Sequence, residues 1–317
     1  MWCPQETGRR RLDPRYPRHS LDRNSTLTMR SLSPNAALAR LRANEVVKLY
    51  VTGNFATPRH VDFICRSGVF DALWFDLEHF DLSTQEVAVL NLVARAFPVT
   101  TIARFKAADY QTVMRILETG VGGIMCSMVG SAAEAQQVVQ WAKFNSPSPG
   151  PGEVTGIRGW NGGNIDAAYA TLPALDYIRH QNTQTMIICQ IETEAAVEES
   201  RAIAAVPGVD GLFFGPGDYS VSIGLPGQID HAQVRSAMGR VAEAARSAGK
   251  WWGTVAVGAE MFARVQALGA RLISPGGDIK IMQLGLRELA KTFGASGVNG
   301  VGATSASAVD SSARSSS

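Results

Sequence analysis

An apolar run that ends in three ionisable side chains stands out in this chain. Residues 72–75 are bulky and uncharged, which is typical of a short strand buried on both faces. Asp76, Glu78 and His79 follow at the point where such a strand would leave the core. Because a carboxylate beside an imidazole can exchange protons with a bound substrate, this strand end is a candidate catalytic site.

Polar side chains close other apolar runs in the same way. Arg104 follows one such run, Gln190 and Glu192 end another, and Asp218 follows a Gly-Pro-Gly turn. Two neighbouring carboxylates repel each other unless a proton or a cation lies between them. A hard divalent cation with oxygen ligands, such as Mg²⁺ or Mn²⁺, would therefore suit Glu192 and Asp218. Alternatively, Glu192 caps the helix that follows it and Asp218 only shapes its turn.

Arg104 and His79 each have a structural and a catalytic interpretation. A guanidinium at the end of an apolar strand needs an anion, so Arg104 could pair with Asp76 or Glu78, or it could hold a substrate oxygen. His79 could be a hydrogen-bonded surface group, or it could be a base whose imidazole is oriented by Asp76. Spacing alone leaves both choices open.

The segments that must position these side chains alternate between strand-like and helix-like patterns. We expect strands at 46–51, 72–75, 99–103, 123–128, 185–191, 211–214, 252–257 and 271–274. Helical patterns occur at 57–67, 83–96, 108–119, 131–144, 193–205, 230–248, 258–268 and 279–292. Eight such units predict a (β/α)₈ TIM barrel, an α/β fold in which the C-terminal strand ends form one rim. A doubly wound open sheet is the alternative, but no Gly-x-Gly-x-x-Gly follows the first strand.

The composition changes towards both ends of the chain. We expect a barrel domain at 33–293, a disordered basic extension at 1–32 and a disordered Gly/Ala/Ser tail at 294–317. One internal connection, 145–164, is rich in proline and glycine. Since long loops inside compact domains are usually functional, this one is expected to fold over the barrel mouth as a lid or to contact a partner.

Charge and cysteine content narrow the class of protein. A net charge of +2 on 317 residues argues against a nucleic-acid binder. No run of apolar residues is long enough to suggest a membrane span. The four cysteines form no Cys-x-x-Cys pair, which argues against a zinc site or a disulfide framework and favours a reducing cytoplasm.

Taken in order, these residues resemble the HpcH/HpaI aldolase family of metal-dependent (class II) pyruvate aldolases, which have a TIM-barrel fold. The resemblance spans residues 45–292 and rests on Trp-Phe-Asp-Leu-Glu-His at 74–79, Arg104, Gly-Ile-Arg-Gly at 156–159, Gln-Ile-Glu-Thr at 190–193, and Val-Asp-Gly-Leu-Phe-Phe-Gly-Pro-Gly-Asp-Tyr-Ser at 209–220. The chain departs from the family at Gly217, where alanine is common, and at Ser127, where proline is common. These departures leave the aldehyde in doubt and not the enolate chemistry.

The resemblance implies a role for each of these side chains. Glu192 and Asp218 would bind a divalent metal ion, Mg²⁺, Mn²⁺ or Co²⁺. The implied catalytic residues are His79, Arg104 and Asp76. The implied substrate-binding residues are Arg104, Gln190, Gly215, Pro216 and Gly217.

By the same resemblance, the reaction is the retro-aldol cleavage of a 4-hydroxy-2-keto acid, through a metal-bound enolate, to pyruvate or a close analogue and an aldehyde. The expected partners are therefore a small 2-keto acid and an aldehyde, with a homo-oligomer, in this family a hexamer, as the assembly. Decarboxylation of a 2-keto diacid such as oxaloacetate would use the same enolate site. A barrel that binds a keto acid without turning it over is an alternative of another class.

Overall fold

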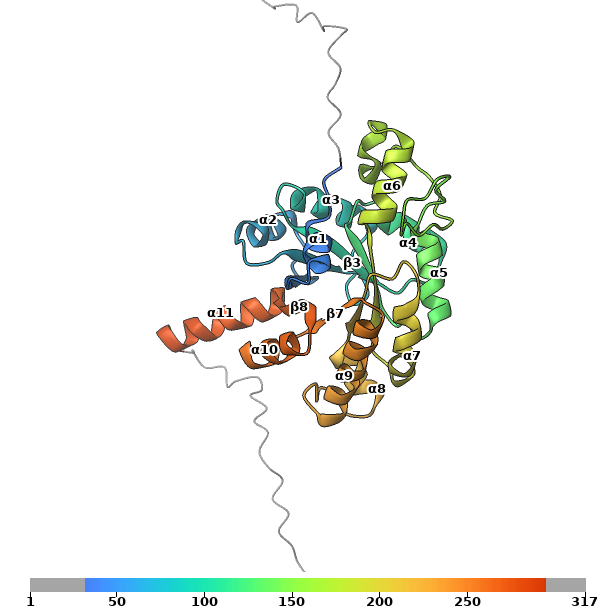
Figure 1. The fold of residues 1–317 in the computed structure, drawn as a ribbon. Coiled ribbons are helices and arrows are strands. Elements are labelled where there is room, and N and C mark those ends of the chain that lie inside the picture. Colours follow the sequence, from blue (N-terminus) through green and yellow to red (C-terminus); the bar gives the residue numbers. More distant parts are fainter. Residues whose placement is uncertain (1–31, 295–317) are drawn as a thin grey trace, which may run out of the picture. The chain divides into compact units, whose positions relative to one another are not determined.

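The computed structural model describes residues 32–294, and its centre is a closed barrel of parallel strands (Figure 1). The strands follow chain order around the barrel, and the last pairs with the first. They are β1 (Val47–Thr52), β2 (Ala72–Asp76), β3 (Thr100–Phe105), β4 (Gly123–Cys126), β5 (Met186–Ile191), β6 (Gly211–Phe214), β7 (Trp251–Val255) and β8 (Ala270–Gly277). The predicted (β/α)₈ barrel is confirmed, and all eight expected strands are present.

Helices connect the strands on the outside of the barrel. They are α1 (Ala36–Arg42), α2 (Pro58–Arg66), α3 (Thr84–Ala94), α4 (Tyr110–Leu117), α5 (Ala132–Ala142), the 3₁₀ helix η1 (Ile165–Ala170), α6 (Ala174–Gln184), α7 (Glu194–Ala205), α8 (Pro216–Ser222), α9 (Ala232–Ser247), α10 (Ala259–Ala267) and α11 (Asp278–Phe293). The expected helices are all present, whereas α1, η1, α6 and α8 were not expected from the sequence.

Side chains that cap helices explain where several of these elements begin. Ser83 accepts a hydrogen bond from the backbone N–H of Glu86, whose carboxylate accepts one in return from the backbone of Ser83. This reciprocal pair is the capping box that the spacing predicted. At α7 the cap is Thr193, whose side chain accepts from the backbone N–H of Ala196. The start of α7 therefore needs nothing from the Glu192 side chain.

The barrel interior is filled at its N-terminal end by α1. Leu38 and Leu41 from α1 pack in one apolar cluster with strand residues such as Leu49, Ile188 and Phe213. A second, larger cluster lies between the strands and the outer helices. Because the interior is closed at this end, side chains that point into the barrel can reach a ligand only at the opposite, C-terminal rim.

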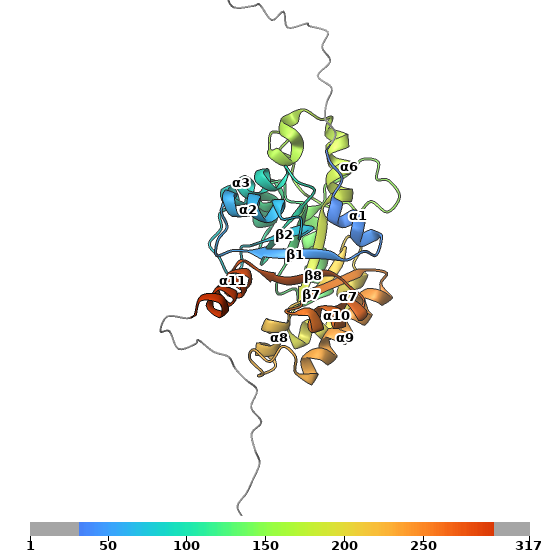
Figure 2. The same ribbon diagram turned by 90° about the vertical axis from the view of Figure 1, so that its left-hand side faces the viewer.

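Helix α11 is an exception to the packing of the other helices. Asp278 is its only buried residue, and apolar side chains such as Leu286 and Phe293 are 59% and 79% exposed. Figures 1 and 2 both show α11 leaving the end of β8 and projecting from the barrel. The outer face of the barrel at β8 and β1 therefore does not cover the apolar side chains of this helix.

The long connection after α5 packs along the outside of the barrel. Gly156, Ile157 and Arg158 donate backbone hydrogen bonds to carbonyl oxygens of the α5 helix and of the two residues that follow it. The N–H of Gly159 donates to the hydroxyl of Tyr110 at the start of α4, at 2.7 Å. The expectation that this segment folds over the barrel mouth is therefore wrong for residues 156–159.

The predicted extensions at 1–32 and 294–317 lie outside the described residues, apart from Leu32 and Gly294. Within residues 32–294, the helices and strands lie between Ala36 and Phe293, but the predicted domain limits remain a prediction. Within residues 32–294, no helix is both long enough and apolar enough to cross a membrane.

Candidate active site

Asp76 and Arg104 face each other at the ends of two neighbouring strands. They are paired in the β2–β3 register, which brings the guanidinium against the carboxylate. Arg104 donates from Nε to Oδ1 of Asp76 at 3.0 Å and from Nη2 to Oδ2. Its Nη1 lies 3.0 Å from Oε2 of Glu78, and the guanidinium carbon lies 4.6 Å from the centroid of the Trp74 ring. The structural interpretation of Arg104 as a buried ion pair is therefore correct.

The same geometry leaves part of the Arg104 guanidinium available to a ligand. A guanidinium has five N–H donors, and the hydrogen bonds to Asp76 occupy two of them, while Nη1 makes only an ion-pair contact with Glu78. The side chain is 5% exposed and held on three sides, so its orientation is set before any substrate binds. Such a preorganised cation is suited to an anionic oxygen, and the pairing with Asp76 is compatible with the substrate role.

Asp76 shapes the turn that carries His79. Its Oδ1 accepts the backbone N–H of Glu78 at 3.1 Å and that of His79 at 3.4 Å. The His79 side chain is exposed, and within residues 32–294 its imidazole makes no hydrogen bond with Asp76. Asp76 thus sets the position of His79 through the backbone, so the expected direct contact with the ring is not observed.

Glu192 is a carboxylate held inside the barrel. It is 1% exposed, accepts the backbone N–H of Met128 at 2.6 Å, and accepts a short hydrogen bond from Nε2 of Gln190. Its pKa is raised to about 7, chiefly by burial. The two hydrogen bonds lower the pKa, and the nearby carboxylates of Glu78 and Asp218 raise it. The protein thus holds Glu192 in a position that disfavours its charge.

The turn after β6 brings backbone and a second carboxylate close to Glu192. A Cβ on Gly215 would lie 2.8 Å from Oε2 of Glu192 and 3.1 Å from Nε2 of Gln190, so only glycine fits here without a shift. Pro216 opens α8, and Asp218 lies exposed in its first turn. At Gly217, by contrast, a Cβ would meet no atom within 4 Å, so the alanine common in the resembled family would also fit.

The donor set at this end of the barrel fits a hard divalent cation. Glu192 and Asp218 offer carboxylate oxygens, and their mutual repulsion with Glu78 is what a bound cation would relieve. Among the described residues, no group of three or more His, Cys, Asp or Glu side chains could hold a metal ion. Two carboxylates would therefore leave the other positions around the ion to water and substrate.

Several buried polar atoms at the same strand ends make no hydrogen bond within the described part of the chain. They are Oγ1 of Thr52, Nε1 of Trp74, Oε2 of Glu78, Oγ of Ser127, Oε1 of Gln190 and Oγ of Ser274. Buried polar groups are usually satisfied, so a row of exceptions at one rim indicates groups that a ligand completes. Gln190 was predicted from the sequence, whereas Thr52 and Ser274 were missed because a lone hydroxyl at a strand end gives no distinct sequence signal.

Met128 joins this rim through a strained backbone. Its φ is 56°, in the left-handed region that a non-glycine residue seldom adopts. Its N–H is the donor to Glu192, and its carbonyl oxygen accepts from Nζ of Lys106 at 2.9 Å. This unfavourable backbone conformation occurs where the Met128 N–H positions Glu192, a candidate metal ligand. Sequence inspection could have found this only through the unusual Ser127 beside it.

Asp278, the first residue of α11, contacts the loop after β1. The cap position of α11 is Gly277, and the Asp278 carboxylate accepts the backbone N–H groups of Gly53 and Phe55, both at 3.0 Å. This carboxylate therefore ties the loop after β1 to the end of β8. Burial raises its pKa, but the backbone donors outweigh burial and lower it overall.

The chain is similar to known proteins along most of its length. A family model described as HpcH/HpaI aldolase/citrate lyase matches residues 49–283. The chain is 32% identical over 221 residues to a hydroxypyruvate/pyruvate aldolase of Paraburkholderia phytofirmans, which covers 69% of this chain and 83% of that relative. It is 29% identical to a 4-hydroxy-2-oxo-heptane-1,7-dioate aldolase of Shigella sonnei, over 71% of this chain and 83% of the relative.

A solved structure agrees with the fold and with these relatives. The crystal structure of an HpcH/HpaI aldolase/citrate lyase family protein from Burkholderia cenocepacia superimposes with a TM-score of 0.74 at 29% sequence identity. The superposition covers 81% of this chain and 98% of that one. The barrel fold therefore has a counterpart among known structures.

Proposed function

The chain belongs to the HpcH/HpaI aldolase/citrate lyase family and is a carbon–carbon lyase of the aldolase type, and we propose that it cleaves a 4-hydroxy-2-keto acid to pyruvate, or a close analogue, and an aldehyde. This substrate class is supported by two groups on the same rim. One is the buried carboxylate of Glu192, whose charged form is disfavoured, and the other is the preorganised guanidinium of Arg104. A 2-keto acid offers two adjacent oxygens to a cation and a negative charge to a guanidinium.

The proposed cofactor is a divalent metal ion, Mg²⁺, Mn²⁺ or Co²⁺, held by Glu192 and Asp218. When bound, the cation would polarise the keto group of the substrate and stabilise the negative charge that develops on its oxygen. Gln190 would hold Glu192 in place, since its Nε2 donates to that carboxylate, and its unpaired Oε1 remains available. The close approach of the Gly215 backbone would complete the wall around the keto acid.

The remaining residues would bind the substrate and move its proton. Arg104, fixed by Asp76 and Glu78, would donate its free N–H groups to a substrate oxygen. His79 stands exposed on the turn held by Asp76, where it can exchange a proton with the 4-hydroxyl group directly or through water. We propose no contact between the Asp76 carboxylate and the His79 ring, because the described hydrogen bonds run through the backbone.

A chelation experiment tests this function. Full-length protein is treated with EDTA, dialysed, and assayed for pyruvate release from 4-hydroxy-2-keto acids with and without Mg²⁺, Mn²⁺ or Co²⁺. Activity should disappear with the chelator and return with at least one of these ions. Full activity in the chelator would overturn the metal-dependent mechanism, and decarboxylation of oxaloacetate without any aldol cleavage would favour the decarboxylase instead.

We also propose that the protein works as a homo-oligomer. Seven large apolar side chains of α11 are between 38% and 79% exposed, which is a surface that monomers rarely leave open. Residues 279, 282, 286, 289 and 293 are spaced three or four apart and so form one apolar stripe along the helix. A second copy of the chain is the occupant that we propose for this stripe.

The free thiols of Cys65, Cys126 and Cys189 support a reducing compartment such as the cytoplasm.

A further inference from the structure

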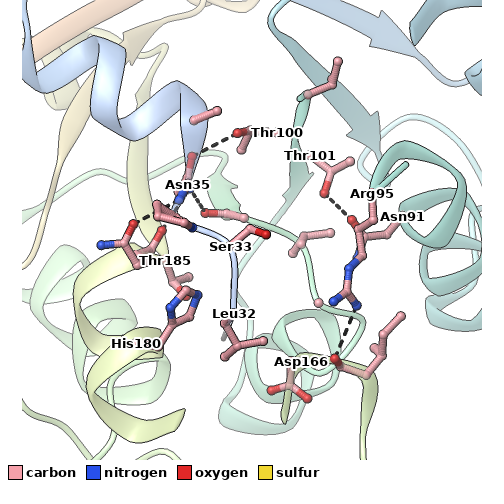
Figure 3. A pocket seen from close by; sticks show the side chains of 18 of the residues that line it. Leu32, Ser33, Asn35, Asn91, Arg95, Thr100, Thr101, Asp166, His180 and Thr185 are labelled. Carbon is pink, nitrogen blue, oxygen red and sulfur yellow. Dashed lines mark hydrogen bonds between the residues drawn. The ribbon is translucent and has the colours of Figure 1, made fainter. Parts of the chain in front are cut away.

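Two cavities lie at the N-terminal end of the barrel, away from the candidate active site. One, of about 380 Å³, lies near the N-terminal ends of β3 and β4 and is shown in Figure 3. Most of its polar groups are already used. Asn35 bonds Thr100 and the backbone of Leu38, and Thr101 donates to Asn91. This cavity therefore offers a ligand few free partners.

The second cavity is larger and positively charged. Its volume is about 910 Å³, near the upper end of the range of small-molecule pockets. Five cationic and two acidic side chains line it, a difference of three positive charges when all are ionised: Arg42, Lys143, Arg246, Lys250 and Arg271 against Glu153 and Asp210. In a protein whose whole chain has a net charge of +2, this is a marked local excess.

The two acidic side chains at this cavity are already engaged. Glu153 accepts from the backbone N–H of Gly150 at 2.9 Å and from Nδ2 of Asn182 at 2.8 Å. Asp210 accepts the backbone N–H of Ile187 at 2.8 Å. Neither carboxylate forms an ion pair with a cation of the cavity among the described residues. Arg246 is paired with Glu243, which lies outside the lining, so the uncancelled positive charge rests on the other four cations.

Lys143 is the buried member of this set. It is 3% exposed, and its Nζ donates to the carbonyl oxygens of Asn182 and Thr185 at 2.8 and 2.9 Å. An ammonium has three N–H donors, so one remains without a partner among the described contacts. Its pKa is lowered to about 8, chiefly by burial, while Asp210 raises it and the cations Arg158 and Arg42 lower it. At neutral pH, an anionic ligand would stabilise this charge.

The rest of the wall suits the organic part of a ligand. Leu41, Trp251 and Leu268 contribute apolar surface to the same cavity. Trp252 also lines it, is 2% exposed, and has an indole N–H without an acceptor in the described part of the chain. A few convergent polar groups on an apolar wall are the usual composition of a small-molecule site.

We propose that this cavity binds a small organic polyanion, one that carries phosphate or carboxylate groups. The site lies at the start of β6 and β7, whereas the candidate catalytic residues lie at the strand ends. A ligand here cannot occupy the keto-acid site, so it binds together with substrate. Lys143 and Lys250 contact the anionic groups, and the apolar wall holds the organic part.

Lys250 offers the cleanest test, because its side chain makes no hydrogen bond or ion pair within residues 32–294 while it lines the cavity. Arg42 supplies a second test from another element, α1, where it donates to the carbonyl oxygen of Thr183 at 3.2 Å. Arg201, exposed on α7 and outside this cavity, is a matched control for the change of charge. None of the three belongs to the proposed catalytic machinery.

The experiment measures binding by isothermal titration calorimetry on metal-free, full-length protein at low ionic strength. Pyrophosphate probes the phosphate class, and tricarballylate, which has no keto group, probes the carboxylate class. At least one should bind, and Lys250→Glu and Arg42→Glu should each weaken that binding by about tenfold, equivalent to about 1.4 kcal/mol. Arg201→Glu should change it by less than about threefold, and the KM for the keto acid should be unchanged in Lys250→Glu.

The outcomes distinguish phosphorylated from polycarboxylate ligands, and either of them from a cavity that binds neither. Binding of pyrophosphate alone assigns the site to phosphorylated ligands, and binding of tricarballylate alone assigns it to polycarboxylates. The proposal is overturned if neither probe binds at millimolar concentration. It is also overturned if Lys250→Glu and Arg201→Glu weaken binding equally, since that would reflect only the net charge of the protein.

Discussion

Glu192 places a carboxylate where the protein interior disfavours its charge. Its pKa is raised from an ordinary value of 4.5 to about 7, first by burial and then by the carboxylates of Glu78 and Asp218. Between these two values the folded state holds a proton that the unfolded state has released. Stability of the metal-free protein therefore falls as the pH rises from about 4.5 to about 7, and the full cost is present above pH 7.

This cost leads to a prediction for Glu192→Gln. The variant should lose at least about 100-fold in aldolase activity with saturating metal. In metal-free buffer at pH 8 it should melt a few degrees higher than the wild type, about 2–4 °C for each kcal/mol recovered. The amide can still accept the Met128 N–H, and Gln190 can turn its unpaired Oε1 towards the new amide N–H. Activity assays and calorimetry measure both effects.

Glu199→Gln is the matched control, since Glu199 is an exposed carboxylate on the neighbouring α7. It should leave both activity and melting temperature unchanged. At pH 4 or below, where Glu192 is protonated in both states, the gain in stability of Glu192→Gln should disappear. A variant that melts lower than the wild type at pH 8 would show that the carboxylate stabilises the metal-free fold.

His79→Ala distinguishes proton transfer from a role in shaping the site. Retro-aldol cleavage needs a proton taken from the 4-hydroxyl group, whereas decarboxylation of oxaloacetate releases CO₂ without that step. The variant should therefore slow aldol cleavage by about 10²–10⁴-fold and decarboxylation much less. Both kcat values are measured on one preparation, so each reaction is the control for the other. Equal losses in the two reactions would assign His79 a positioning role only.

The sequence predicted which residues meet at the rim, but not how they contact each other. Asp76, Arg104 and Glu192 could be found because a charged side chain that ends an apolar strand has few alternatives to the rim of a barrel. Their partners could not be found in this way. Asp76 contacts the backbone of His79 and not its ring, and Glu192 depends on the left-handed Met128, because these contacts follow from local turn geometry.

Among the secondary-structure elements, the strands were easier to predict than the helices that are additional to the eight strand–helix units. Apolar, branched strand residues have one buried arrangement, and all eight strands were expected close to where they occur. Helix α6 was missed because its buried positions include Gln181 and Asn182, which interrupt the apolar pattern. Helix α8 was missed because its Gly-Pro-Gly start is also typical of a turn.

The connection between α5 and α6 is held by a buried ion pair. Nη2 of Arg158 lies 2.8 Å from Oδ2 of Asp166, and both side chains are fully buried. Tyr177 of α6 also donates its hydroxyl to this carboxylate, and the guanidinium lies over the Phe144 ring at 4.5 Å. The shape of this segment therefore depends on one charge pair that water does not screen.

Arg158→Met should lower the free energy of unfolding by about 3–5 kcal/mol, because it leaves the Asp166 carboxylate buried without its cation. Urea unfolding followed by circular dichroism measures the loss. Arg66→Ala is the control, since Arg66 pairs with Asp62 at 2.8 Å on the exposed surface of α2. That variant should lose no more than about 1 kcal/mol. Similar losses in both variants would mean that Arg158 contributes only as much as a surface pair.

At the scale of the whole molecule, α11 sets the relation between fold and assembly. In a complete barrel the last helix covers the outer face of the last and first strands, but α11 keeps only Asp278 buried. That residue bonds the loop after β1, so the start of the helix is fixed beside the rim while the rest projects. A partner that covers α11 would thus be anchored next to the candidate active site.

Leu286 lies in the middle of the apolar stripe on α11 and is 59% exposed. If a second copy covers this stripe, Leu286→Lys would bury a charge at the contact and should shift the protein from an oligomer towards a monomer. Thr292→Lys adds the same charge outside the stripe, about 100° around the helix from its centre, and should leave the assembly unchanged. Light scattering after size-exclusion chromatography measures the masses. A monomeric wild type would contradict the proposed oligomer. Equal effects of the two variants would contradict the proposed contact, because that contact requires the apolar stripe and not the helix as a whole.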